Sequence, residues 1–256
     1  MTADQTLLAE LDLARQLAGL ASEIALHYFD RGVSGDIKPD GTPVTVADRE
    51  IEQALVEALM RSRPEDAVVG EELGARGASP RRWLLDPIDG TFNFVRGNAE
   101  WGTHVALELG EHIVLGIITR PALGLSWWAS RGSGAYRSEI LPSSTGVRLN
   151  VSRRAELRTS RVTVWTNEGD PIVDSLSRQA KWTEPNLDAI LHLAEGGLEA
   201  VIDRNGRPWD HAPAVVLVEE AGGRFSDSFA GHRVDLGEGR FTNGLIDDEL
   251  AALLSK

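Results

Sequence analysis

The stretch from Trp83 to Phe94 constrains this chain most, because an apolar run there ends in two carboxylates held between proline and glycine. It reads Trp-Leu-Leu-Asp-Pro-Ile-Asp-Gly-Thr-Phe-Asn-Phe. An apolar run bounded by such residues predicts a buried strand that leads into a tight turn. That turn would bring Asp86, Asp89 and the Ile88 carbonyl, all hard oxygen ligands, into one small volume. Converging hard oxygens favour Mg²⁺, Mn²⁺ or Ca²⁺ over zinc.

A plain turn is the alternative interpretation, because Asp, Pro and Gly are favoured turn formers on their own account. Two further acidic clusters shift the balance toward a site. Glu71 and Glu72 close the β-prone run 67–69, and Asp210 precedes the apolar, helix-like stretch 214–221. The two glutamates could equally be a solvated pair, and Asp210 stands where a helix N-cap would stand.

Asp48 also has two interpretations that are compatible with each other. Thr45 to Asp48 has the spacing of a capping box ahead of an amphipathic stretch that begins at Ile51. An acid in a first helical turn is favoured by the helix dipole. A capped helix start is also a firm mount for a functional carboxylate.

Composition limits the classes of protein and partner. The 256 residues carry a net charge of −13, are 42 % hydrophobic and include no cysteine. This describes a globular chain without disulfides, and it argues against nucleic acid or an anionic membrane as partner. No run approaches the ~20 apolar residues of a membrane span, and the acidic N-terminus does not resemble a secretory signal. We expect a cytoplasmic protein.

Helical and strand-like patterns alternate along the chain, which predicts a mixed α and β layered fold. A turn-rich segment at 141–146 is the best seam between two halves. The six histidines lack a His-Glu-x-x-His spacing and are interpreted as ordinary surface or core residues. Helices are expected at 5–30, from 45, and at 172–179, 187–195 and 214–221, and strands near 68 and 84 and at 105–109, 113–119, 126–129, 162–165 and 198–203.

The motifs together resemble the inositol monophosphatase family, over nearly the whole chain and in the family's order. The motifs are Thr-Val-Ala-Asp at 45–48, Gly-Glu-Glu at 70–72, Asp-Pro-Ile-Asp-Gly-Thr-Phe-Asn-Phe at 86–94, Trp-Asp-x-Ala-Pro-Ala at 209–214, Glu-Ala-Gly-Gly at 220–223 and Thr-Asn-Gly at 242–244.

The resemblance implies an α+β fold with layers α-β-α-β-α. Residues 1–256 would form a single phosphatase unit. Its approximate halves would be 1–143, with the metal and phosphate motifs, and 144–256, with the substrate pocket and the final metal ligand. Members of the family are often dimers, so we expect a homodimer. The implied cofactor is Mg²⁺, as two or three ions with Mn²⁺ as a substitute, and lithium sensitivity is implied as well.

The resemblance also implies a role for each motif residue. Thr91, bonded to Asp48, would orient the attacking water and act with Glu71 in catalysis. The Gly90 and Thr91 amides would hold the phosphate, Asp203 would contact a substrate hydroxyl, Lys38 would lie in a mobile loop over the site, and Glu72 would lie behind the ligands. The implied metal ligands are Glu71, Asp86, the Ile88 carbonyl, Asp89 and Asp210, and the implied substrate-binding residues are Asp89, Gly90, Thr91, Asp203 and Asp210.

The substrate is the least constrained part of the prediction. The stretches 93–97 and 38–45 look most like the histidinol-phosphate phosphatase branch, whereas 182–188 departs from the family pattern. Glu184, Asp188 and Asp203 could place negative charge near the leaving group and favour a cationic amino alcohol. The first two could also be solvated acids at a helix start. We expect histidinol phosphate first and inositol 1-phosphate or a related cyclitol second. A non-catalytic binding or regulatory protein on a phosphatase scaffold is the alternative of another class.

Overall fold

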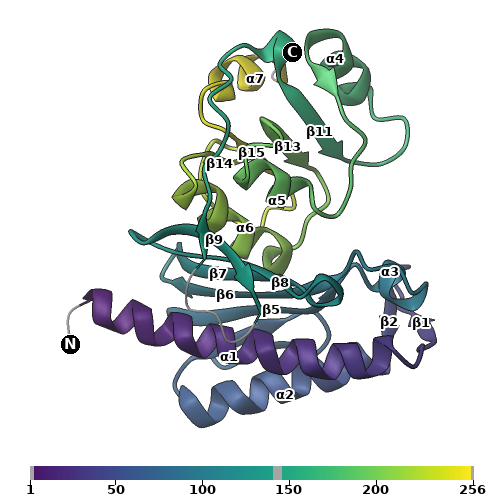
Figure 1. The fold of residues 1–256 in the computed structure, drawn as a ribbon, viewed down its shortest axis with the longest axis vertical. Coiled ribbons are helices and arrows are strands. Elements are labelled where there is room, and N and C mark those ends of the chain that lie inside the picture. The colour runs from purple at the N-terminus through teal and green to yellow at the C-terminus, as the bar shows by residue number, and fades with distance from the viewer. Residues whose placement is uncertain (1–2, 141–145, 255–256) are drawn as a thin grey trace.

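Two sheets and three helical layers alternate through the molecule (Figure 1). The computed structural model describes residues 3–140 and 146–254. Helices α1 and α2 cover one outer face, α5 and α6 lie between the sheets, and α4 and α7 cover the other outer face. The predicted α+β fold with α-β-α-β-α layers is confirmed. The helices are α1 (Ala3–Phe29), α2 (Val46–Ser62), α3 (Thr91–Val95), α4 (Pro171–Gln179), α5 (Ala189–Ala194), α6 (Pro208–Glu220) and α7 (Asp247–Leu254), with 3-10 turns at Pro121–Leu123 and Leu157–Thr159.

The larger sheet has eight strands in the order β10-β9-β8-β7-β6-β5-β3-β4. Its neighbouring strands are antiparallel except for the parallel pair β3 and β5. Strands β3 and β5 carry the acids of the first two clusters at their ends. The strands are β3 (Ala67–Gly70), β4 (Gly74–Arg76), β5 (Arg81–Asp89), β6 (Gly102–Leu109), β7 (His112–Arg120), β8 (Leu125–Ser130), β9 (Gly134–Glu139) and β10 (Val147–Arg148).

The smaller sheet belongs to the second half and has the order β12-β11-β13-β15-β14. A separate hairpin of β1 and β2 carries Lys38 in its connection and leads directly into α2. The strands are β1 (Gly35–Ile37), β2 (Pro43–Thr45), β11 (Arg161–Trp165), β12 (Lys181–Trp182), β13 (Ala200–Asp203), β14 (Arg224–Asp227) and β15 (Gly239–Thr242).

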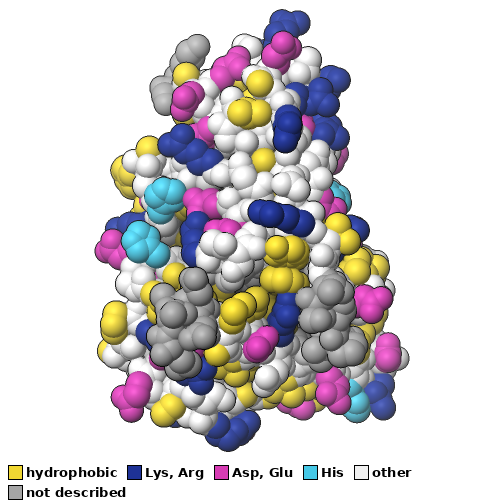
Figure 2. Space-filling model, turned by 60° about the vertical axis from the view of Figure 1, so that its left-hand side comes forward, with side chains coloured by type: hydrophobic (Ala, Val, Ile, Leu, Met, Phe, Trp, Pro, Cys, Tyr) yellow, Lys and Arg dark blue, Asp and Glu magenta, His cyan; other side chains and the backbone are white. Residues whose placement is uncertain are grey.

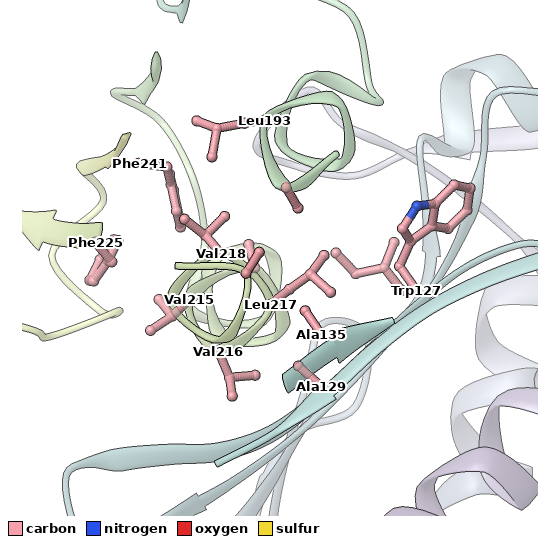
Figure 3. Close-up of a cluster of buried hydrophobic side chains, with 14 of the residues drawn as sticks. Trp127, Ala129, Ala135, Leu193, Val215, Val216, Leu217, Val218, Phe225 and Phe241 are labelled. Carbon is pink, nitrogen blue, oxygen red and sulfur yellow. The ribbon is translucent and has the colours of Figure 1, made fainter. Parts of the chain in front are cut away.

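Apolar side chains fill the spaces between the layers. Around α6, Val215, Leu217 and Val218 point to different sides and pack in one cluster with side chains of both sheets, including Trp127 and Phe241 (Figure 3). This helix is buried nearly all round, as expected of a helix between two sheets. A second cluster joins α1 and α2 to the other face of the large sheet, and a third lies beneath α4 and α7.

The strand that carries the central motif is longer than predicted. We expected it to end at Asp86, but β5 continues to Asp89, with a shift of register against β6 between these two residues. Pro87 has no N–H to give to a ladder, so the pairing is interrupted there without the strand ending. The Thr103 hydroxyl donates to the Pro87 carbonyl at 2.9 Å and satisfies it. The two carboxylates therefore lie on a bulged strand rather than on a free turn.

The long helix predicted at 5–30 is confirmed as α1, but the last predicted helix begins earlier than expected. It starts at Pro208 instead of directly after an N-cap at Asp210, so Pro213 lies inside the helix and beyond its first turn. Asp210 is the third residue of its first turn and not its N-cap; its Oδ2 accepts the backbone N–H of Arg207 at 2.8 Å. Apolar periodicity could not mark this start, because the first turn carries functional polar residues.

The described surface mixes both charges despite the net charge of −13. On the face drawn in Figure 2, Lys and Arg side chains are interspersed with Asp and Glu. Within the described residues, no helix is long and apolar enough to cross a membrane. The predicted boundary between halves at 143 and 144 falls within 141–145, outside the described residues, and the division stays a prediction.

Candidate active site

A cavity of about 820 Å³ lies where the ends of β3 and β5 meet the start of α6. A second hollow of about 280 Å³ shares Asp89, Asn205 and Asp210 with it and extends toward the second half. Asp48 and Glu72 do not line either cavity, and Asp203 lines the smaller one. The predicted residues that line the larger cavity are Lys38, Glu71, Asp86, Ile88, Asp89, Gly90, Thr91 and Asp210.

Asp86 is the most deeply buried of the acids that line the two cavities. It is 2 % exposed, and its Oδ1 has no hydrogen-bond partner. Burial raises the pKa of Asp86 well above its usual value, and the carboxylates of Glu71, Asp89 and Asp210 raise it further. A buried, unpartnered oxygen among like charges is unfavourable unless a cation joins the group.

Asp210 brings the second half of the chain into this group. It is the third residue of α6, and the helix dipole favours an acid there. Burial nevertheless raises the pKa of Asp210 well above its usual value, with Asp89, Asp203 and Glu71 adding to the effect and the Arg207 amide opposing it. Residues more than a hundred positions apart therefore repel one another across a single cavity.

Asp89 differs from the other two acids because a histidine and an arginine face it. Its Oδ2 lies 3.2 Å from His104 Nε2 and 3.6 Å from Arg120 Nη2. Burial alone would raise the pKa of Asp89, but His104 and Arg120 outweigh burial, and the pKa falls below its usual value. Asp89 is therefore the carboxylate of this group that ionises most readily.

Thr91 and Asp48 are joined as the family resemblance implied. Thr91 Oγ1 lies 3.2 Å from Asp48 Oδ1 and 2.9 Å from the Ile88 carbonyl oxygen. Asp48 also closes the predicted capping box, which is confirmed, because its Oδ2 accepts the backbone N–H of Thr45 at 2.7 Å. Burial raises the pKa of Asp48, although hydrogen bonds from both threonines oppose this.

Packing supports the turn that follows Asp89, in addition to hydrogen bonds such as the one from the Asn93 amide to the Gly90 carbonyl at 2.8 Å. Gly90 has φ 82°, which a residue with a Cβ rarely adopts, and a Cβ there would lie 2.9 Å from the Glu100 carbonyl oxygen. Behind the turn, Phe94 packs against Trp101 with ring centroids 4.8 Å apart. The position of Thr91 is therefore fixed from beneath by the aromatic core.

The two glutamates of the Gly-Glu-Glu motif are held in place by Lys38 and Glu52. Lys38 Nζ bridges them, 2.7 Å from Glu71 Oε1 and 2.8 Å from Glu72 Oε1. Burial would lower the pKa of Lys38, but these bonds raise it well above its usual value. Glu52, which sequence reasoning missed, is buried and accepts the amides of Glu72 and Leu73, so it fixes the turn that presents Glu71.

The smaller cavity has a polar floor and an aromatic edge. Asp203 Oδ2 lies 3.1 Å from Nε2 of the fully buried His211, and the Asp203 Oδ1 accepts the Asn205 amide. Trp165, 38 % exposed, lines the same cavity. Beyond the shared Asp89 and Asp210, this side of the site offers the Asp203 carboxylate and the Trp165 indole to a leaving group.

Glu184 and Asp188 do not supply the charge suggested for the leaving-group pocket. Neither residue lines either cavity. Asp188 instead accepts Nε of Arg120 at 2.7 Å, and Glu184 accepts the indole N–H of Trp182 at 3.4 Å. Leu187 and Ile190 do line the pocket, but the intervening acid pairs with Arg120 and is not part of its lining.

Two of the six histidines that we interpreted as ordinary surface or core residues lie at the site. His104 and His211 both line the smaller cavity, and both are buried. Arg120, 1 % exposed beneath Asp89, was missed as well. Their single available signal was position in or beside an apolar stretch, and that pattern more often marks a satisfied core residue.

Comparison with known proteins agrees with this geometry. The chain belongs to the inositol monophosphatase family, whose model matches residues 7–256. It is a phosphomonoesterase, and thus a hydrolase, of that family. The family is metal-dependent, and the described residues include an acidic and histidine cluster that could bind a metal ion.

Relatives with assigned names include two actinobacterial proteins. "Histidinol-phosphatase" of Streptomyces coelicolor is 36 % identical over 263 residues, covering 97 % of this chain and 98 % of that protein. A Streptomyces griseus protein named "Glucose-1-phosphate thymidylyltransferase" is 39 % identical over 251 residues and 96 % of both chains. A solved structure, the Thermotoga maritima IMPase, superposes with a TM-score of 0.84 at 25 % identity, over 96 % of this chain and 97 % of its own.

Proposed function

We propose that this enzyme hydrolyses a small phosphate monoester with divalent cations held by Glu71, Asp86, Asp89, Asp210 and the Ile88 carbonyl. The observation that carries the proposal is the unpartnered Oδ1 of Asp86, buried among three other carboxylates. Every one of these donors is an oxygen, which is what Mg²⁺ prefers. The all-oxygen donor set, with the raised pKa of Asp86 and Asp210 that a cation would offset, therefore fits Mg²⁺, in two or three ions, with Mn²⁺ as a substitute.

Bound divalent cations supply positive charge that offsets the acids, lower the pKa of water and stabilise developing charge on a phosphoryl group. The residues of the chain supply position. Thr91 has one hydroxyl proton, so when it donates to Asp48 its lone pairs remain available to accept a hydrogen bond from an attacking water and so orient it. The Gly90 and Thr91 amides lie beside this hydroxyl and would orient the phosphate, with Asp89 and Asp210 flanking the ester.

For the substrate, histidinol phosphate is our first candidate. Relatives named histidinol-phosphatase support it, and so do the contents of the smaller cavity. A flat, cationic leaving group could lie against Trp165 and pair with Asp203. Inositol 1-phosphate is the second candidate, because Asp203 also suits a hydroxyl.

A binding or regulatory role on a phosphatase scaffold is the alternative of another class. That alternative does not explain the carboxylates at the cavity. Four such groups near one another lower the stability of the fold in the absence of a cation. A biological role that survives loss of turnover in a folded variant would favour this alternative.

The test is a comparison of substrates with and without metal. We expect kcat/KM for histidinol phosphate to exceed that for inositol 1-phosphate, glucose 1-phosphate and AMP by about tenfold or more, as one well-placed polar contact can provide. Glucose 1-phosphate is included because of the name of the Streptomyces griseus relative.

Excess EDTA should abolish turnover of every substrate in the panel, and Mg²⁺ added beyond the chelator should restore it. Hydrolysis that continues undiminished under chelation would overturn the metal assignment. Equal turnover of all four esters would be compatible with the phosphatase chemistry. It would contradict the proposal that the smaller cavity selects the leaving group.

A further inference from the structure

One imidazole lies among the acids and has no assigned role. His104 on β6 is the antiparallel partner of Asp86 on β5, so the two side chains project from the same face of the sheet. One nitrogen of His104 and one oxygen each of Asp86 and Asp210 all lie within 4.8 Å of one another. The α6 helix thus closes a three-residue group whose other two members come from neighbouring strands.

The histidine is placed as a ligand would be. It is 6 % exposed, and neither Nδ1 nor Nε2 makes a hydrogen bond of normal geometry, although Nε2 lies 3.2 Å from Asp89 Oδ2. Buried polar atoms are nearly always paired, because leaving one without a partner is unfavourable. The unpartnered Oδ1 of Asp86 faces the same group. A buried imidazole and a buried carboxylate, each with atoms that lack a hydrogen-bond partner, therefore lie in one group.

We propose that His104 is a nitrogen ligand of an ion that Asp86 and Asp210 also hold. The inference rests on the proposed function in that these two acids belong to the same metal site. An imidazole suits first-row transition metals, whereas Mg²⁺ prefers oxygen alone. The chain therefore has one mixed nitrogen and oxygen position that favours Mn²⁺ or Co²⁺, while the remaining oxygen donors keep their fit to Mg²⁺.

The spacing allows this coordination after a small adjustment. Metal–nitrogen and metal–oxygen bonds of about 2.0–2.2 Å hold two ligand atoms at most about 4.2–4.4 Å apart. The observed span of up to 4.8 Å closes to that range by rotation of side chains. His211 is the natural comparison, because it is equally buried and lines the same cavity but contacts Asp203 instead of the acid cluster.

Pulsed electron paramagnetic resonance on the intact chain loaded with substoichiometric Mn²⁺ tests the proposal. We expect ¹⁴N modulation from a coordinated imidazole in the wild type, its loss in His104→Gln, and its retention in His211→Gln. Calorimetric titration with Mn²⁺ and with Mg²⁺ should show that His104→Gln lowers the Mn²⁺ to Mg²⁺ affinity ratio by about tenfold. His104→Leu repeats the test if the Gln variant does not fold, with circular dichroism as the check.

Each outcome has a separate meaning. Mn²⁺ that binds the wild type without ¹⁴N modulation overturns the role of His104 and leaves the oxygen site intact. Modulation that survives in a folded His104 variant, or that disappears in His211→Gln, also overturns it. Absence of any Mn²⁺ or Mg²⁺ binding to the wild type removes the proposed function and this inference together.

Discussion

Asp86→Asn is expected to lower metal-dependent turnover by about 10³-fold, which corresponds to about 4 kcal/mol of transition-state stabilisation. The variant removes one carboxylate from the centre of the proposed cation site while preserving side-chain volume. The metal-free protein should at the same time become more stable by on the order of 1 kcal/mol, because a buried charge among like charges is removed. Steady-state kinetics and urea unfolding with EDTA measure the two effects.

The distinctive expectation is that Asp86→Asn lowers turnover but raises the free energy of unfolding of the metal-free protein. Asp235→Asn is the matched control, because Asp235 is 44 % exposed and pairs with Arg233 away from the cavity. It should leave turnover unchanged. If Asp86→Asn retained turnover within tenfold of the wild type, Asp86 would not be a ligand.

The same group sets a pH dependence. The pKa of Asp86 and of Asp210 is raised in the folded state, so the folded metal-free protein binds protons more tightly than the unfolded chain. Its free energy of unfolding should therefore fall as pH rises from about 3.8, the ordinary value, toward the raised folded values. Unfolding measured between pH 4 and 7 should show a shallower decline in Asp86→Asn. An equally steep decline in both proteins would contradict this.

Arg120→Met is expected to lower the free energy of unfolding by about 3–5 kcal/mol, because it leaves a partly buried acid without its partner. Arg120 lies at the end of β7, is 1 % exposed, and reaches into the second half of the chain. Its Nε donates to Asp188 Oδ1 at 2.7 Å, and its Nη2 donates to the Leu187 carbonyl at 3.2 Å. The guanidinium therefore ties the large sheet to the segment before α5.

Two comparisons separate this role from charge in general. Arg137→Met breaks an ion pair with Glu195, also between the large sheet and the α5 region, but the Arg137 side chain is 40 % exposed. That variant should cost less than about 1 kcal/mol. Adding Asp188→Leu to Arg120→Met should recover part of the loss, because the unpaired acid is then gone. If both Arg variants lowered the free energy of unfolding in urea equally, the proposed stabilising role of the buried Arg120 contacts would be refuted.

Local features of the site could be predicted from the sequence because they depend on neighbours along the chain. The Thr45 to Asp48 capping box follows from spacing alone, and the structure shows both of its hydrogen bonds. The apolar periodicity of α1 identified the helix that covers the large sheet. Spaced acids at the ends of β-prone runs indicated a cation site before any tertiary contact was known.

Errors arose where one residue serves two purposes. Asp86 to Asp89 was predicted as a tight turn, but β5 continues through it, and the Thr103 hydroxyl satisfies the Pro87 carbonyl that the ladder leaves free. The predicted start of α6 was too late along the chain because its first turn carries the polar Asp210 and faces a cavity. Apolar periodicity does not identify a helical turn of this kind.

The sequence by itself determined which acids are available, the capped mount of Asp48 and the glycine at position 90. Only the tertiary structure decided that His104 faces Asp86, that Arg120 lies beneath Asp89 and that Asp188 turns away from the pocket. Strand register decides the first of these, because a shift by one residue would send His104 to the opposite face of the sheet. Register and helix docking depend on contacts between distant segments, and no short stretch of sequence contains them.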